Sequence, residues 1–83
     1  MTLTVYSKTI CQPCRATKRK LELLGLPYDA VNVDETPEAA DYLIEKGYRE
    51  TPVVELTLDG EVARTWTGYR PDLIEALARE VAA

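Results

Sequence analysis

Two cysteines, Cys11 and Cys14, stand in the stretch TICQPCRATKRK, and the chain has no other cysteine and no histidine. A Cys-x-x-Cys pair can exchange disulfides with a substrate, bind a metal together with other ligands, or crosslink the fold. A crosslink over so short a loop would stabilise the fold by about 2 kcal/mol, less than the roughly 3 kcal/mol of a 15-residue loop. A closed zinc site needs four ligands, so zinc would require carboxylates or a second chain. The spacing therefore favours a redox dithiol.

Positive charge is crowded beside this pair. Five of the ten Lys and Arg residues lie within the first twenty positions, and no acidic residue precedes Glu22: Lys8, Arg15, Lys18, Arg19 and Lys20. Such a run is usually a solvated helix face, and that interpretation stays open. Because nearby cations and a helix N-terminus favour an anion, we also expect the pKa of Cys11 to fall from about 8.5 into roughly the 3.5–7.5 range. We assign Cys11 as the attacking thiolate and Cys14, one turn into the helix, as the resolving thiol.

The composition limits the class of protein. A chain of 83 residues with 46% hydrophobic content predicts a single globular domain over residues 1–83. The net charge of −4 argues against a general nucleic-acid-binding protein. No apolar stretch approaches the roughly 18 residues needed to span a membrane, and the start MTLTVYSK is unlike a signal peptide. We therefore expect a cytoplasmic protein, in a compartment that keeps ordinary thiols reduced.

Hydrophobic periodicity and turn residues outline the elements that must position the cysteines. They predict strands at 2–6, 28–33, 53–58 and 61–66, and helices at 12–24, 34–47 and 71–82. Thr36 is expected to cap the second helix, Pro37 to open it and Gly47 to close it, and Asp59-Gly60 predicts a hairpin. This β-α-β-α-β-β-α order predicts an α/β fold with a four-stranded mixed sheet flanked by three helices.

The same patterns predict the interior of the domain. On the first helix Cys14, Leu21 and Leu24 can share one face, and on the last helix Leu73, Leu77 and Val81 form an apolar stripe. The residues expected in the core include Val5, Val31, Val33, Leu43, Val53, Val54 and Leu73.

Two further motifs give the chain a family resemblance. Thr51-Pro52 precedes the third predicted strand, and the segment Trp-Thr-Gly-Tyr-Arg-Pro-Asp occupies positions 66–72. Together with the strand, loop, Cys-x-x-Cys and helix at the start, these motifs resemble the glutaredoxin-like NrdH-redoxins, small members of the thioredoxin fold. The resemblance covers essentially the whole chain in motif order, spacing and length.

The resemblance implies a binding surface around the cysteines. Pro52 would follow a cis peptide bond and face the pair, and Thr51 would present its backbone to an extended substrate. Arg70 and Asp72 would fix their loop and cap the last helix, which begins at Pro71. The expected substrate- and partner-binding residues are Lys8, Gln12, Pro13, Thr51, Pro52, Trp66, Thr67, Gly68, Tyr69 and Arg70. Trp66 and Tyr69 also have a plainer interpretation, as partly buried aromatic residues near a strand end.

The resemblance also implies a role. NrdH-redoxins carry electrons from NADPH, through thioredoxin reductase, to the large subunit of a class Ib ribonucleotide reductase. The chain would then be a protein-disulfide reductase whose only redox group is the Cys11–Cys14 disulfide, with no bound cofactor. We expect it to act as a monomer without nucleic acid or membrane, and acidic substrate tails would suit its basic cluster.

Other functions remain open. A glutaredoxin that uses glutathione or mycothiol would suit Lys8 and Thr51-Pro52, although the bulk of Tyr69 and the missing donor of Pro71 disfavour it. A binding module could hold zinc between two chains, or use the cysteines as a redox-sensitive docking point. The pair between the cysteines, Gln12-Pro13, also departs from the Val-Gln typical of NrdH-redoxins and the Pro-Tyr of glutaredoxins. A proline before the second cysteine, as in thioredoxin, would favour a stronger reductant.

Overall fold

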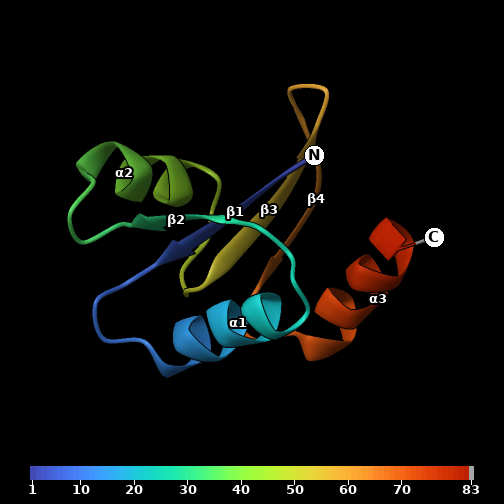
Figure 1. Cartoon of the computed structure of the whole chain (residues 1–83). Helices are drawn as coiled ribbons and strands as arrows, with labels where there is room; N and C mark the ends of the chain where they lie inside the picture. Colours follow the sequence, from blue (N-terminus) through green and yellow to red (C-terminus); the bar gives the residue numbers. More distant parts are fainter. Residues whose placement is uncertain (83) are drawn as a thin grey trace.

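The sequence folds around one four-stranded sheet, described for residues 1–82 by a computed structural model (Figure 1). The predicted order of elements is confirmed, with these bounds: β1 Thr2–Ser7, α1 Gln12–Leu23, β2 Asp29–Asn32, α2 Pro37–Glu45, β3 Val53–Leu58, β4 Glu61–Thr67 and α3 Pro71–Ala82. The strands lie in the order β2-β1-β3-β4. β1 pairs with β2 in parallel and with β3 antiparallel, and β4 pairs antiparallel with β3, so the sheet is mixed as predicted.

Helix α1 begins directly after Cys11, which occupies its N-cap position. Pro13 stands in the first turn, where its missing N–H costs no helical hydrogen bond. The helix ends at Leu23, so Leu24 falls outside it and is 39% exposed, contrary to the predicted buried face. Thr17 takes a buried position instead, because its hydroxyl donates to the Pro13 carbonyl at 2.8 Å and leaves no unpaired polar group.

Helix α2 is shorter than the predicted span. Thr36 does precede Pro37 at the N-cap, but its side chain makes no capping hydrogen bond. The Thr36 carbonyl instead accepts from the backbone N–H groups of Ala39 and Ala40. The predicted hairpin is confirmed: Asp59 and Gly60 both have positive φ, 53° and 82°, as a tight two-residue turn between twisted strands requires.

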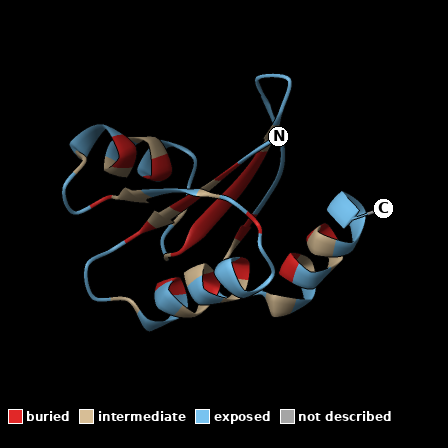
Figure 2. Ribbon diagram, viewed as in Figure 1, coloured by how far each residue is buried: buried red, intermediate tan, exposed pale blue. Residues whose placement is uncertain are grey.

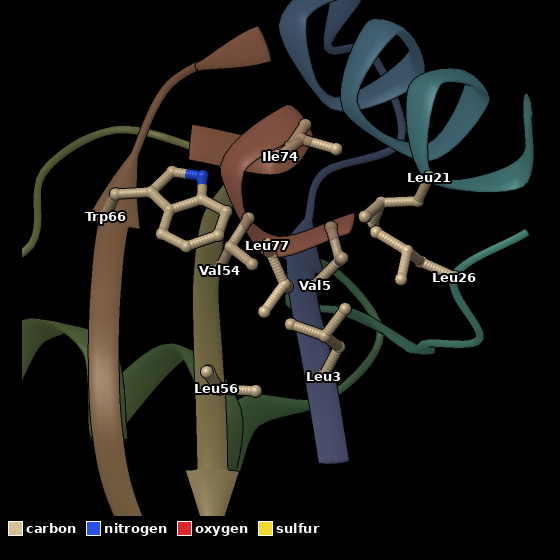
Figure 3. Packing of buried hydrophobic residues seen from close by; sticks show 9 residues of the cluster. All are labelled: Leu3, Val5, Leu21, Leu26, Val54, Leu56, Trp66, Ile74 and Leu77. Carbon is tan, nitrogen blue, oxygen red and sulfur yellow. The ribbon is translucent and has the colours of Figure 1, made fainter. Parts of the chain in front are cut away.

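Two hydrophobic clusters cover the two faces of the sheet. In Figure 1, α1 and α3 lie on one face and α2 lies on the other. The larger cluster joins α1 and α3 to the strands, and Figure 3 shows its members: Leu3, Val5, Leu21, Leu26, Val54, Leu56, Trp66, Ile74 and Leu77. The smaller cluster lies under α2 and consists of Val33, Ala39, Leu43 and Val53. Figure 2 shows that central strand β3 is the most fully buried part of the sheet.

Five of the seven predicted core residues are buried: Val5, Val33, Leu43, Val53 and Val54. Val31 and Leu73 are only partly buried and pack against the rims of the clusters. On α3 the fully buried residue is Ile74, at 0% exposure, while Val81 is 51% exposed. The buried side of α3 therefore consists of Ile74 and the predicted Leu77, with Leu73 at the rim of the larger cluster. Val31 lies on the edge strand β2, where one flank of the strand has no neighbouring strand to cover it.

A carboxylate lies within the α2 face of the sheet. Glu55 is only 6% exposed and accepts hydrogen bonds from the hydroxyl of Tyr42, at 2.6 Å, and from that of Tyr6, at 3.4 Å. The hydrogen bond to Glu55, followed by burial, raises the pKa of Tyr42 to about 12, and burial raises the pKa of Tyr6. This group connects α2 to β1 and β3, and no local sequence pattern predicts it.

Within residues 1–82, none of the helices has the length and apolar character needed to cross a bilayer.

Candidate redox site

The two cysteines form a disulfide at the N-terminus of α1. The Cys11–Cys14 S–S distance is 2.06 Å. Cys11 is partly exposed, whereas Cys14 is 1% exposed. The backbone N–H of Cys14 donates to Cys11 Sγ at 3.2 Å, so a free N–H of the helix start points at this sulfur. The predicted placement of an accessible sulfur at the N-cap and a buried one inside the helix is confirmed.

Thr51 also contacts the exposed sulfur, in addition to the N–H of Cys14. Its Oγ1 lies 3.4 Å from Cys11 Sγ. Because a disulfide sulfur carries no proton, the Thr51 hydroxyl is the donor in this state. The Thr51-Pro52 peptide bond is cis, as the family resemblance implied. The family resemblance implied a role for the backbone of Thr51 alone. The contact of its side chain with Cys11 was not predicted, although a hydroxyl next to the predicted proline is a signal for it.

The backbone of Thr51 is also available. Outside the regular elements, the backbone hydrogen bonds of residues 1–82 include none from Thr51. The carbonyl of the next residue, Pro52, accepts from the N–H of Gly68 at 2.9 Å. Thr51 can therefore pair with an extended segment placed beside Cys11.

A pocket of about 500 Å³ opens beside Thr51. Lys8 and Arg49 bring positive charge to its lining, Glu50 brings negative charge, and apolar side chains of α2 supply much of the remainder. Since Thr51 contacts both the pocket and Cys11, this pocket adjoins the disulfide. Lys8 is thus in the neighbourhood that the sequence predicted, whereas Gln12 and Pro13 are exposed on the first turn of α1.

The segment after β4 forms the other side of the site. Gly68 has φ 80°, a conformation that favours glycine, and its N–H bonds Pro52. Arg70 holds Asp72 through two hydrogen bonds, Nε to Oδ1 at 3.1 Å and Nη2 to Oδ2 at 2.9 Å, which confirms the expected loop contact. The hydrogen bond from Arg70 lowers the pKa of Asp72. Thr67 donates its hydroxyl to Glu50 at 2.9 Å and so ties the segment to the pocket rim.

The two aromatic residues of this segment differ in exposure. Trp66 is 8% exposed and packs in the larger cluster beside Val54 and Leu77 (Figure 3). Its indole N–H is buried and has no hydrogen-bond acceptor among residues 1–82. Tyr69 is 39% exposed. The plainer interpretation thus describes Trp66 well, whereas Tyr69 presents its ring to solvent next to Arg70.

The basic residues around the cysteines are largely unpaired. Lys20 bonds Glu75 of α3 at 2.8 Å. Within the described chain, the ion pairs involve none of Lys8, Arg15, Lys18 and Arg19. The four residues define a cationic rim at the start of the chain and along α1, and Arg15 directly follows Cys14.

The connection before Cys11 has polar contacts that were not predicted from the sequence. The backbone N–H of Thr9 donates to Asp34 Oδ2 at 2.9 Å, and Asn32 Nδ2 donates to Thr9 Oγ1 at 3.1 Å. Asn32 Oδ1 also accepts from the Asp34 N–H at 2.9 Å. The signal in the sequence was an Asn-x-Asp pattern at the end of a strand, which is typical of side chains that bond nearby backbone.

No group of three or more potential metal ligands gathers anywhere in residues 1–82. Both sulfurs are engaged in the disulfide. In this state the site offers no thiolate to a metal, and its chemistry is disulfide exchange.

Comparisons with known proteins agree with this chemistry. The glutaredoxin family model matches residues 3–62. The chain is 43% identical to the glutaredoxin-like protein NrdH of Salmonella typhimurium over 77 residues, which cover 93% of this chain and 89% of the relative. It is 37% identical to the NrdH protein of Lactococcus lactis subsp. lactis over 76 residues, covering 92% and 99%.

Solved structures show the same fold. The NrdH-redoxin of Escherichia coli superposes with a TM-score of 0.81 at 42% identity and covers 93% of this chain and 95% of that one. The thioredoxin of Fasciola hepatica, 19% identical, gives a TM-score of 0.76, over 95% of this chain and 78% of that one, and supports the fold alone. The fold is therefore thioredoxin-like, as the family resemblance implied, and the Cys11–Cys14 disulfide at its helix start is redox-active.

Proposed function

The chain belongs to the NrdH group of the glutaredoxin family, and on this premise we propose that it carries electrons from thioredoxin reductase to a class Ib ribonucleotide reductase. The observation that supports this most directly is the 42% identity to the E. coli NrdH-redoxin, a glutaredoxin-like protein with a thioredoxin-like activity profile. NADPH would supply the electrons through the reductase, so the chain itself needs no cofactor beyond its disulfide. The cycle would run in the cytoplasm, with the chain as a monomer.

The proposed reaction moves two electrons per cycle. The Cys11 thiolate attacks a substrate disulfide, forms a mixed disulfide and releases one substrate thiolate, which takes up a proton. Cys14 then loses its proton and attacks Cys11 Sγ, which forms the Cys11–Cys14 bond and releases the second substrate thiol. The substrate is reduced and the chain is oxidised, in the state that the structure shows. Thioredoxin reductase returns the two electrons.

The exposure of the two sulfurs supports these roles. Only Cys11 is open to a protein substrate, because Cys14 is 1% exposed. The Cys14 N–H and the Thr51 hydroxyl would both donate to a thiolate at Cys11 and favour its charged form. A hydrogen-bonded thiolate at a helix N-terminus is the arrangement that lowers a cysteine pKa.

We propose that the partner binds across the edge formed by Thr51 and Pro52. An extended segment can pair with the free backbone of Thr51, while Tyr69 offers an exposed aromatic contact and Lys8 faces the pocket. Gln12, Pro13, Thr67, Gly68 and Arg70 complete the proposed surface. Trp66 would support this surface from below, since its ring lies in the core.

One observation favours a second function. The pocket beside Thr51 has room for a small thiol such as glutathione or mycothiol, and Lys8 and Arg49 could pair with its carboxylates. The segment after β4 is less suited to such a thiol, because Tyr69 is exposed there and Arg70 is already engaged by Asp72. We therefore rank a glutaredoxin activity second.

The deciding experiment follows NADPH consumption in two coupled systems. The first contains thioredoxin reductase, this protein and a class Ib ribonucleotide reductase with its nucleotide substrate. The second contains glutathione, glutathione reductase and a small mixed disulfide. Turnover in the first system alone is the result that we expect, and turnover in the second alone would overturn the proposal in favour of a glutaredoxin.

A Cys14→Ser variant is the matched control for both systems. A dithiol carrier loses its activity without the resolving thiol, whereas removal of glutathione from a mixed disulfide can proceed with Cys11 alone. Metal analysis of the reduced protein tests the remaining alternative, a zinc-bridged module, which predicts about half a zinc ion per chain.

A further inference from the structure

The three residues between β1 and Cys11, Lys8–Ile10, lie outside regular structure. This connection leads directly into Cys11, and so its conformation sets where the attacking sulfur sits. It also holds Lys8, which lines the pocket, and Ile10, which is 89% exposed. An exposed side chain of this kind cannot anchor the connection by packing.

The backbone anchors the connection only at its edges. Before it, the Ser7 carbonyl accepts from the Val33 N–H at 2.8 Å, and after it the Cys11 carbonyl accepts from the Arg15 N–H at 3.2 Å. Between these points the backbone hydrogen bonds found among residues 1–82 include none from Lys8, Thr9 or Ile10. Other groups must hold the middle of the connection.

Two side chains, Asn32 at the end of β2 and Asp34 just after it, form hydrogen bonds with the middle of the connection. The Asp34 carboxylate accepts the backbone N–H of Thr9 at 2.9 Å, and the Asn32 amide donates to the Thr9 hydroxyl at 3.1 Å. Asn32 in turn accepts the Asp34 N–H, so the two side chains brace each other. These contacts fasten the connection to the loop that follows β2, about 25 residues along the chain.

We infer that Asp34 is a positioning residue of the redox site: through its hydrogen bond to the Thr9 N–H it holds Cys11 at the N-cap of α1. The inference rests on the redox chemistry of the Cys11–Cys14 pair and not on which partners the chain serves. A reacting atom that is displaced by about 1 Å can lose two orders of magnitude in rate, so one anchor next to a nucleophile can matter for reactivity beyond its contribution to folding.

The test uses the reduced full chain and a small aromatic disulfide, dithiobis(nitrobenzoate), which needs no protein docking. Single-turnover rates are recorded across pH for the wild type, Asp34→Ala and Asp34→Asn. The asparagine keeps an oxygen that can accept from Thr9 but removes the charge. Glu35→Ala is the control, because Glu35 is an exposed neighbouring acid whose side chain has no hydrogen bond or ion pair within residues 1–82.

We expect Asp34→Ala to lower the rate at neutral pH about tenfold and to move the pH profile upward, because Cys11 is then held less closely at the helix N-terminus. Asp34→Asn should restore most of the rate, and Glu35→Ala should match the wild type. Thermal denaturation is recorded for every variant.

Three outcomes would overturn the inference. If Asp34→Ala lowers the melting temperature but leaves the pH profile in place, the residue is merely structural. If Asp34→Asn behaves like Asp34→Ala, the charge matters and the hydrogen bond does not. If Glu35→Ala gives the same loss, the effect belongs to the acidity of the loop. A failure of the reductase assay would leave all these readouts intact, so the two proposals can fail separately.

Discussion

At the scale of single residues, the Cys11 sulfur has two hydrogen-bond donors, one local and one from a distant part of the chain. The Cys14 N–H belongs to its own helix, whereas the Thr51 hydroxyl comes from the segment before β3. The first donor follows from local sequence, since any helix start offers free N–H groups. The second depends on the tertiary fold, because Thr51 is 40 residues away.

Thr51→Val tests the second donor. Valine has nearly the shape of threonine but no hydroxyl, so the Cys11 thiolate loses one hydrogen bond. The thiolate form of Cys11 is then less favoured, and we expect the pKa of its thiol to rise above that of the wild type. Ultraviolet absorbance of the thiolate during a pH titration of the reduced protein measures the shift. Thr57→Val, on β3 away from the site, serves as the control, and an unchanged pKa in Thr51→Val would contradict the assigned role.

At the scale of elements, the two faces of the sheet are held by different means. Helices α1 and α3 bury a continuous hydrophobic cluster, and the Lys20–Glu75 pair joins them at their surface. Helix α2 has a smaller cluster and adds the buried Glu55 with its two tyrosine donors. The contact that holds α2 is thus partly polar.

Tyr42→Phe tests the polar contact. The change leaves the buried Glu55 with only the longer hydrogen bond from Tyr6, and we expect the free energy of unfolding to fall by about 1 to 3 kcal/mol. Urea denaturation measures it. Tyr48→Phe removes a hydroxyl that bonds Thr65 at an exposed position and should cost less. Equal losses in the two variants would argue against a special contribution of Glu55.

The same contact predicts that the free energy of unfolding depends on pH in the alkaline range. The hydrogen bond to Glu55 and burial raise the pKa of Tyr42 from the usual 10.0 of a free tyrosine to about 12, so the folded state favours the protonated hydroxyl. This contribution to stability is complete below pH 10 and is lost as the pH rises towards 12. Denaturation at stepped pH should show a steeper decline above pH 10 in the wild type than in Tyr42→Phe. Parallel curves would show that Tyr42 is not the group responsible.

The particular residues show what a sequence can and cannot predict here. The positions of Cys11, Pro13 and the Asp59-Gly60 turn depend on rules that act over a few residues, and each was predicted. The contacts of Glu55, Asp34 and the Thr51 hydroxyl join segments 13 to 49 residues apart, where no local pattern names the partner. The burial of Ile74 on α3 has the same origin, because it packs in a cluster with residues of α1 and of the strands.

At the scale of the whole molecule, charge is distributed unevenly. The chain carries a net charge of −4, yet the cationic rim of Lys8, Arg15, Lys18 and Arg19 lies around and along the redox helix. The remaining surface is therefore more acidic than the net charge suggests. Such a polarity can orient an acidic partner towards the disulfide before contact.

Arg19→Glu tests this orientation. If an acidic partner is attracted by the rim, kcat/KM with thioredoxin reductase should fall about threefold or more at low ionic strength, and the gap should narrow at 0.15 M salt, where the Debye length is about 8 Å. Arg79→Glu, in the last turn of α3 and not one of the four rim residues, makes the same change of net charge and should have little effect. Equal kcat/KM values in the two variants that do not change with salt would contradict the proposed electrostatic steering.

The antiparallel register of β1 and β3 separates the two ends of the molecule. Thr2 pairs with Thr57 and Tyr6 with Val53. The start of the chain and the Asp59-Gly60 turn therefore lie at the same end of the sheet, while Cys11 follows the opposite end of β1. The six residues of β1 place about 20 Å between these two ends of the sheet. A linker attached at Met1, which is 58% exposed, would tether the protein to an electrode or bead with its disulfide directed outward into solution.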